Sequence, residues 1–309
     1  MTKSIFVAAR RRLAATLIIL AGLAAGIAHA QNTAPTEASR EAERQAAWKA
    51  GVQAGTKGPA EIKLHDQAVL AVPPNDFFIP KAEAARIMRA LGNTINEETF
   101  DGIVIGTRAS DDWIVVVRYI KEGYIKDDEA KDWNADELLQ NLKEGTEEAN
   151  KDRAARGFAE LEVLGWVEKP TYDAATHRLV WSLLSKHKGE PDTALKGINY
   201  NTYALGREGY FSLNLLTNSQ RIDADKPAAH TLLAALTYNN GKRYEDFNSA
   251  TDHIAAYGIA ALVGGIAAKK LGLIAIAGAF ALKFAKIIGL GIAAVVGGFW
   301  KLLGRRRDA

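Results

Sequence analysis

The densest group of side chains that could do chemistry is acidic. Residues 127–136 read DDEAKDWNAD, and the last five place oxygen donors at the spacing that opens an EF-hand calcium loop. Glu137 stands where that loop requires glycine, and Lys143 stands where it requires a bidentate glutamate. An EF-hand is therefore excluded. Two interpretations stay open: a different divalent-cation site, and a solvated turn that caps a helix.

Paired carboxylates are the second possible chemistry. Asp127, Asp128 and Asp173 could supply them, because glycoside hydrolysis needs two carboxyl groups roughly 5–10 Å apart across a cleft. An envelope hydrolase that acts on cell wall or lipid is therefore one hypothesis for the function.

The other side chains give no catalytic, metal-binding or cofactor-binding pattern. The chain has no cysteine, which excludes disulfides, thiolate metal sites and cysteine nucleophiles. The histidines that follow residue 30 include no pair at the spacing of metal ligands on a helix. Neither a nucleophile elbow nor a glycine-rich phosphate loop is present. We therefore predict no cofactor and no metal, and we favour a non-enzymatic role over a catalytic one.

Aromatic and polar side chains alternate in several segments that favour β-structure. Such aromatics usually lie in a sheet core or in cross-strand pairs, but they also form ligand grooves and partner surfaces. The predicted interaction surface consists of eight residues: Asp127, Asp128, Trp166, Tyr172, Asp173, Trp181, Arg207 and Tyr210.

The segments that must position these residues alternate between strand-like and helical patterns. The predicted strands are 60–64, 67–72, 102–107, 113–120, 162–168, 178–184, 199–205 and 210–216. The predicted helices are 81–91, 134–156 and 227–236, and Asn134 can cap the second with Glu137 in the capping-box position. Locally paired strands with inserted helices predict an α+β domain with a largely antiparallel sheet.

The amino-terminal segment has the three parts of a secretory signal. Three arginines at 10–12 precede an apolar run over 13–27, and Ala28-His29-Ala30 presents small residues where a signal peptidase cleaves. We predict a signal peptide over 1–30 and a spacer over 31–57, helical from residue 37 to residue 52. An uncleaved anchor is the alternative, although its apolar run is short for a span of about 20 residues.

The carboxyl-terminal segment is apolar but interrupted by lysines. Lys269, Lys270, Lys283 and Lys286 divide residues 254–300 into runs of 15, 12 and 14 residues, and three arginines follow at 305–307. A span from about residue 287 to Trp300 fits the positive-inside rule if the basic tail is cytoplasmic. We predict a hydrophobic helical membrane segment over 254–304 and a cytoplasmic basic tail over 305–309. A buried helical hairpin is the alternative.

The net charge of +3 hides an acidic middle. Of the 39 Lys and Arg residues, 4 lie in residues 1–30 and 8 lie in residues 254–309, which leaves 27 in residues 31–253. Of the 36 Asp and Glu residues, only Asp308 lies in these end segments, so the middle holds 35 acids and a net charge of −8. Nucleic-acid binding is not expected, because it needs Lys and Arg to neutralise phosphates.

Several strings together resemble a known family. They are WIVVVRY (113–119), EGYIKDDEA (122–130), GWVEKPTYD (165–173), NYNTYALGREG (199–209) and YEDFN (244–248). This combination is similar to a family of uncharacterised, membrane-anchored bacterial proteins that carry domain of unknown function 2167. The resemblance implies an exported domain with a membrane segment after it, and it implies no activity, cofactor or catalytic residue.

These observations predict a periplasmic α+β domain over 58–253, held at the inner membrane by the segment that follows it. Three roles remain open for this domain. The first is a binding or interaction module with an envelope protein as partner, the second is an accessory subunit of an inner-membrane complex, and the third is the envelope hydrolase. The sequence favours them in that order.

Overall fold

The computed structural model describes residues 37–155 and 157–264. The predicted signal peptide, the first residues of the spacer, most of the predicted membrane segment and the basic tail lie outside these ranges. Among the helices in the two described ranges, none is long and apolar enough to cross a membrane.

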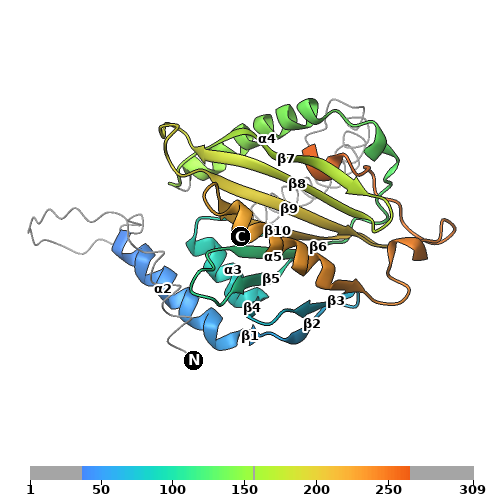
Figure 1. Cartoon of the computed structure of the whole chain (residues 1–309), viewed down its shortest axis with the longest axis horizontal. Helices are drawn as coiled ribbons and strands as arrows, with labels where there is room; N and C mark the ends of the chain where they lie inside the picture. The colour runs from blue at the N-terminus through green and yellow to red at the C-terminus, as the bar shows by residue number, and fades with distance from the viewer. Residues whose placement is uncertain (1–36, 156, 265–309) are drawn as a thin grey trace, which may run out of the picture.

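The framework is an eight-stranded antiparallel sheet (Figure 1). In spatial order its strands are β1 (Thr56–Lys57), β4 (Asp76–Pro80), β5 (Phe100–Gly106), β6 (Ile114–Ile120), β10 (Tyr210–Asn218), β9 (Gly197–Leu205), β8 (Arg178–His187) and β7 (Leu161–Asp173). The structure therefore confirms the α+β class and the antiparallel sheet.

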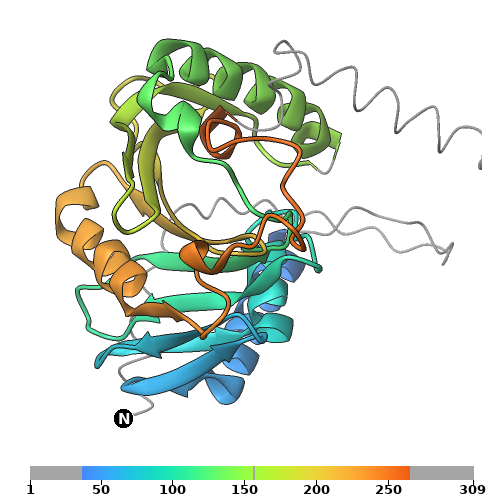
Figure 2. The ribbon, with the colours of Figure 1, turned by 90° about the vertical axis from the view of Figure 1, so that its right-hand side faces the viewer.

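One face of this sheet is covered by a small sheet and a helix. The small sheet is β11 (Leu236–Tyr238), β3 (Ala68–Val72) and β2 (Ala60–Leu64), and α5 (Ile222–Ala235) lies beside it. Fully buried side chains of both units, Leu70 and Leu232, join Phe211 and Leu213 of β10 in one core. Figure 2 shows α5 on the side of the sheet opposite to α4.

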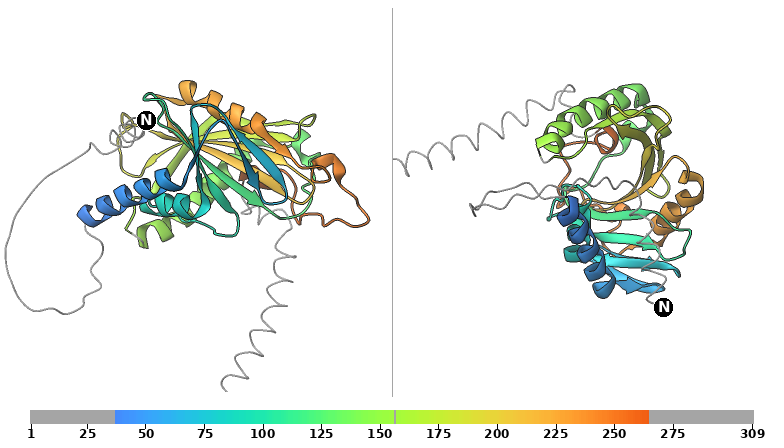
Figure 3. Two further views of the ribbon diagram at one scale, coloured as in Figure 1. Left: turned by 90° about the horizontal axis from the view of Figure 1, so that it is seen from below. Right: turned by 90° about the vertical axis from the view of Figure 1, so that its left-hand side faces the viewer.

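The other face is covered at its two ends by different helices. Over β4–β6 lie α2 (Glu37–Ala54) and α3 (Lys81–Ala90), while α4 (Ala135–Ala155) and α6 (Ala261–Gly264) cover β7–β9. Figure 3 shows α2 and α3 running side by side. The short 3-10 helix η1 (Asp128–Lys131) precedes α4, and a second one, η2 (Tyr244–Asp246), precedes the last described segment of the chain.

Several elements differ from the sequence expectations, among them β7, which continues to Asp173 beyond the predicted 162–168. The helix predicted over 37–52 of the spacer is present as α2, but it packs on the domain, where the small residue Gly51 lets it approach Ile79 and Ile87 closely, and the unpredicted strand β1 follows it. Residues 76–80, which lie between the predicted strand 67–72 and the predicted helix 81–91, form β4, because Phe77, Phe78 and Ile79 are buried between neighbouring layers. Helix α5 begins at Ile222, five residues before the predicted start at Pro227.

Candidate functional site

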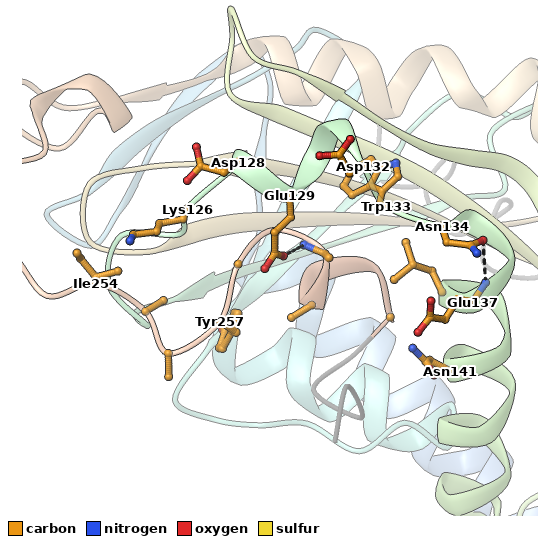
Figure 4. A pocket seen from close by; sticks show the side chains of 17 residues that line it. Lys126, Asp128, Glu129, Asp132, Trp133, Asn134, Glu137, Asn141, Ile254 and Tyr257 are labelled. Carbon is orange, nitrogen blue, oxygen red and sulfur yellow. Dashed lines mark hydrogen bonds between the residues drawn. The ribbon is translucent and has the colours of Figure 1, made fainter. Parts of the chain in front are cut away.

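A groove opens between the start of α4 and the last described segment of the chain (Figure 4). Its volume is about 830 Å³, which falls in the range of small-molecule and peptide sites. Polar lining residues are Lys126, Asp128, Glu129, Asp132, Asn134, Glu137 and Asn141, and larger apolar ones are Trp133, Leu138, Ile254 and Tyr257.

The α4 side of the groove is fixed by a helix cap. The Asn134 side-chain oxygen accepts hydrogen bonds from the backbone N–H groups of Asp136 (3.0 Å) and Glu137 (3.3 Å). This confirms the predicted cap, which satisfies N–H groups that have no partner within the helix. The cap fixes the direction of the first turn, so Glu137 and Leu138 line the groove.

The opposite side is formed by residues 253–260, which we call the strap. The strap runs along the segment that follows β6 and bonds to it through the backbone. The N–H of Tyr124 donates to the His253 carbonyl (2.8 Å), the N–H of Ala255 donates to the Tyr124 carbonyl (2.9 Å), and the N–H of Ile259 donates to the Lys126 carbonyl (2.9 Å). Residues about 130 positions apart in the chain therefore form one wall.

Glu129 joins η1 to the strap. Its carboxylate accepts from the backbone N–H of Ala260 at 3.4 Å. A Cβ atom at Gly258 would lie only 2.6 Å from a Glu129 oxygen, so a larger residue there would push the Glu129 carboxylate out of this position. Glu129 therefore ties η1 to the strap, across about 130 positions of the chain.

The charge of the groove is strongly negative. Among the described lining residues, Asp128, Glu129, Asp132 and Glu137 contribute four carboxylates, and Lys126 is the one cation. The aromatic and aliphatic lining supplies apolar surface beside these charges. This arrangement favours an occupant that is positively charged and partly apolar, through charge complementarity and apolar burial.

Asp127 and Tyr172 meet in a cluster next to the groove, not in it. The Tyr172 hydroxyl donates to an Asp127 carboxylate oxygen (2.7 Å) and lies 3.1 Å from His177 Nδ1. The His177 ring stacks on Tyr244 with 4.0 Å between centroids. Burial raises the pKa of the Tyr172 hydroxyl, and the Asp127 hydrogen bond raises it further. The phenol therefore stays protonated and acts as a donor.

Trp166 and Trp181 hold α4 on the sheet. The indole N–H of Trp166 donates to the Ala135 carbonyl in the first turn of α4 (3.1 Å). Its ring meets Trp181 edge to face at 6.0 Å, and Trp181 is buried. Both side chains therefore position the helix that carries the groove residues.

The remaining predicted residues lie at turns and in the sheet. Asp173 accepts from the Ala175 N–H (2.9 Å) and the Thr176 hydroxyl (2.7 Å), and these bonds lower the pKa of its carboxyl group. Tyr210 packs edge to face on Tyr203 at 5.8 Å. Of the eight residues predicted as an interaction surface, Asp128 alone lines the groove.

Arg207 pins the loop that leads into the strap. Its guanidinium donates two hydrogen bonds to Asp252, at 2.7 and 2.8 Å, and a third to the Gly241 carbonyl at 3.2 Å. The Arg207 bonds, followed by the Asn248 backbone N–H, hold the pKa of Asp252 well below its usual value. Bidentate arginine–carboxylate pairs impose geometry as well as attraction.

We expect Arg207→Gln to loosen the strap. Loss of the bidentate pair frees the Asp252 loop, so the amide hydrogens of Tyr124, Ala255 and Ile259 should exchange about tenfold faster or more, since local opening sets their protection. Hydrogen exchange with mass spectrometry measures this directly. Arg243→Gln is the matched control, because the Arg243–Asp246 pair is more exposed and lies within one short turn. Equal exchange in both variants would refute this role of Arg207.

Sequence reasoning missed most of the groove. Trp133, Glu137 and Asn141 are separated by four residues each, a spacing that places side chains on one face of a helix and its cap. This spacing can be recognised in the sequence. The position of Tyr257 opposite this face cannot, because it depends on where the strap lies.

Among the described residues, neither the groove nor the cluster of Asp127, Tyr172 and His177 holds a group of potential metal ligands. Within residues 37–155 and 157–264, no three His, Asp or Glu side chains are grouped so that they could hold a metal ion.

Comparison with known proteins identifies the family but not an activity. The comparison with curated protein sequences gave no match. Among solved structures, the chain is similar to cyanobacterial PsbP (CyanoP) from Synechocystis sp. PCC 6803, with 11% identity, 58% of this chain and 92% of that chain covered, and a TM-score of 0.37. It is also similar to the Ran-binding protein Mog1p of Saccharomyces cerevisiae, with 12% identity, 58% and 94% covered, and a TM-score of 0.29. At these TM-scores the likeness supports no functional conclusion.

The family model covers most of the folded domain. Residues 56–296 match the family described as "Protein of unknown function (DUF2167)". This agrees with the resemblance of the sequence strings, while the membrane anchoring that the resemblance implies stays a prediction. Because the match covers more than half of the chain, the protein belongs to the DUF2167 family.

Proposed function

We propose that this protein is a non-enzymatic binding module of the bacterial envelope. In this proposal the domain is exported, is held at the inner membrane by the segment after residue 254, and stands in the periplasm. Its groove binds a lysine- or arginine-bearing, partly apolar segment of an envelope protein. Two features of the sequence support this placement. Three arginines precede the apolar run at the amino terminus, and basic residues lie around the apolar segment at the carboxyl terminus.

The observation that carries the proposal is the composition of the groove. Four carboxylates face one ammonium group over an apolar lining that includes Trp133 and Tyr257. Lysine and arginine side chains match such a surface well, because their stems cover apolar area while their heads meet carboxylates. Aromatic residues in a groove are also frequent anchors of protein interfaces.

Two of the three carboxylates that the hydrolase hypothesis uses have other roles in this structure, whereas the third, Asp128, lines the groove. Asp127 accepts from the Tyr172 hydroxyl, and Asp173 caps its own turn. A binding role agrees with these contacts, because it needs no pair of free carboxyl groups across a cleft. A partner that is itself part of an inner-membrane complex would give the accessory role.

The first test is site-specific photocrosslinking of the full-length protein in intact cells. A photoreactive residue at Asn141 points at the groove, whereas one at Glu148 lies on an exposed part of the same helix outside it. We expect a crosslinked envelope protein from position 141 and none from position 148. Mass spectrometry should place the crosslink on a segment of the partner that contains Lys or Arg.

Charge reversal tests the electrostatic part of the proposal. We expect Asp132→Lys combined with Glu137→Lys to reduce the crosslink yield from position 141 about tenfold, which corresponds to about 1.4 kcal/mol. Glu144→Lys combined with Glu148→Lys makes the same charge change on α4 away from the groove and should leave the yield unchanged. No crosslinked protein at position 141, or an equal effect of both pairs, refutes the proposal. If position 141 crosslinks to the protein's own basic tail, the groove binds that tail, and the proposal of an envelope partner is refuted.

A further inference from the structure

A strip of polar side chains crosses the middle of the main sheet, on the face that carries α2, α3 and α4. The register places Arg118 of β6 opposite Ser212 of β10, and Ser212 opposite Tyr203 of β9. The next row pairs Asn214 with Asn201. Directly opposed residues point to the same face, with Cβ atoms about 5 Å apart. These five side chains therefore form one continuous patch.

The strip separates two apolar clusters on this face. On one side lie Ile114 and Val116 with the helices α2 and α3, and on the other lie Trp181 and Leu183 with α4. Asn201 and Ser212 are more than nine-tenths buried, whereas Arg118 and Asn214 are half-buried. The strip is therefore largely desolvated but can be reached from solvent.

Arg118 is charged and lacks a partner in the part of the chain that the structure describes. No hydrogen bond, ion pair or ring contact involves its side chain, whereas Arg108, Arg207 and Arg221 each pair with a carboxylate. Burial lowers the pKa of its guanidinium, and the groups that face it are the hydroxyls of Tyr203 and Tyr210. An unpaired, desolvated charge lowers the stability of the folded state, so folding alone gives no reason to retain it.

A second unsatisfied group lies two residues from Ser212 on the same strand. The side-chain oxygen of Asn214 is buried and has no hydrogen-bond partner in the described ranges. Native proteins satisfy nearly all buried polar atoms, so an exception needs an explanation. This oxygen is an acceptor, so a carboxylate cannot satisfy it; the observation shows only that the strip keeps an unsatisfied polar group, as functional sites often do.

We propose that this strip binds the carboxylate of a small organic ligand, with Arg118 as the charged anchor. The planar guanidinium fork matches a carboxylate in a bidentate arrangement. One guanidinium balances one negative charge, and the hydroxyls of Ser212 and Tyr203 and the amide of Asn201 are suitable donors to the carboxylate oxygens. The apolar clusters on both sides favour a ligand with an apolar body. The strip shares no lining residue with the groove, although Tyr210, which faces Arg118, is hydrogen-bonded to Tyr257 of the groove; the proposal does not depend on the function of the groove.

The test uses the full-length protein in detergent and the thermal unfolding midpoint, Tm. A ligand that binds only the folded state raises Tm with concentration. At constant ionic strength we expect hexanoate to raise Tm more than acetate does, and inorganic phosphate to have no effect beyond that of salt. Arg118→Gln should weaken the hexanoate response about tenfold or more. Arg86→Gln, which removes an exposed arginine from α3, should leave the response unchanged.

A second variant separates this role from a structural one. Without ligand, Arg118→Met should keep Tm or raise it by a few degrees, because the substitution removes an unpaired charge and fills the same space. A structural arginine would show the reverse, a clear loss of Tm. The proposal is overturned if hexanoate has no effect on the wild type, if Arg118→Gln responds equally, if phosphate acts in place of hexanoate, or if Arg118→Met lowers Tm by more than a few degrees.

Discussion

Replacing Asp225 with alanine is expected to lower the free energy of unfolding by about 3 kcal/mol, because it breaks a buried charge pair. Asp225 lies in the first turn of α5 and is 1% exposed. Its carboxylate accepts from the Thr217 hydroxyl (2.6 Å) and from Arg221 Nη2 (2.7 Å). These bonds fix α5 to the end of β10, and α5 covers the largest core of the protein.

Chemical denaturation of the full-length protein measures this loss. Asp223→Ala is the matched control, since Asp223 stands in the same helical turn but is exposed, and surface substitutions usually change stability by less than about 0.5 kcal/mol. Asp225→Asn should fall between the two, because the amide keeps an acceptor for Thr217 but loses the charge that Arg221 meets. A loss below about 1 kcal/mol for Asp225→Ala would show that Arg221 and Thr217 find equivalent partners in solvent.

Replacing Asp76 with asparagine is expected to raise the free energy of unfolding at neutral pH, the opposite of the effect at Asp225. Asp76 begins β4 and is 8% exposed. Burial, followed by the charge of Asp111, raises the pKa of its carboxyl to about 6, and Arg108 offsets only part of this. Because the folded state binds the proton more tightly than the unfolded state does, this group's contribution to stability is full below about pH 4. It is lost as pH rises through about 6.

The variant should therefore be more stable than the wild type by about 2 kcal/mol at pH 7, where Asp76 is ionised. Asparagine resembles the protonated acid, so the difference between the two proteins should shrink as the pH falls from 7 to 4. Denaturation curves over this pH range give the difference directly. Asp112→Asn, an exposed acid beside Asp111, should show no such trend. A difference that is constant with pH would disprove the expected titration of Asp76.

Locally encoded features of the fold could be predicted from the sequence. The Asn134 cap lies next to the helix it starts, so the predicted helix 134–156 differs from α4 by one residue at each end. The hairpin of β9 and β10 was equally visible, because two alternating strands flank the Gly-Arg-Glu-Gly turn at 206–209. In these cases the determining interactions span only a few residues.

The candidate site was predicted poorly, for a different reason. Trp166, Trp181 and Tyr210 attract attention as aromatics in polar strands, yet they pack on α4 or on other strand side chains. An aromatic residue in a strand has the same local pattern whether its face is covered or open. Only the position of α4 and the strap distinguishes the two cases.

The sequence by itself determined the α+β class, the order of most strands along the chain, the α4 cap and the acidic character of the domain. These follow from hydrophobic periodicity, capping and composition, which are local or additive properties. The tertiary structure alone decided that the strap and α4 form a groove, and that Arg118 lies where no carboxylate of the described residues meets it. The reason is physical: strap contacts join residues about 130 positions apart, and the partners of Arg118 depend on the register of three strands. Neither is encoded in any short stretch of sequence.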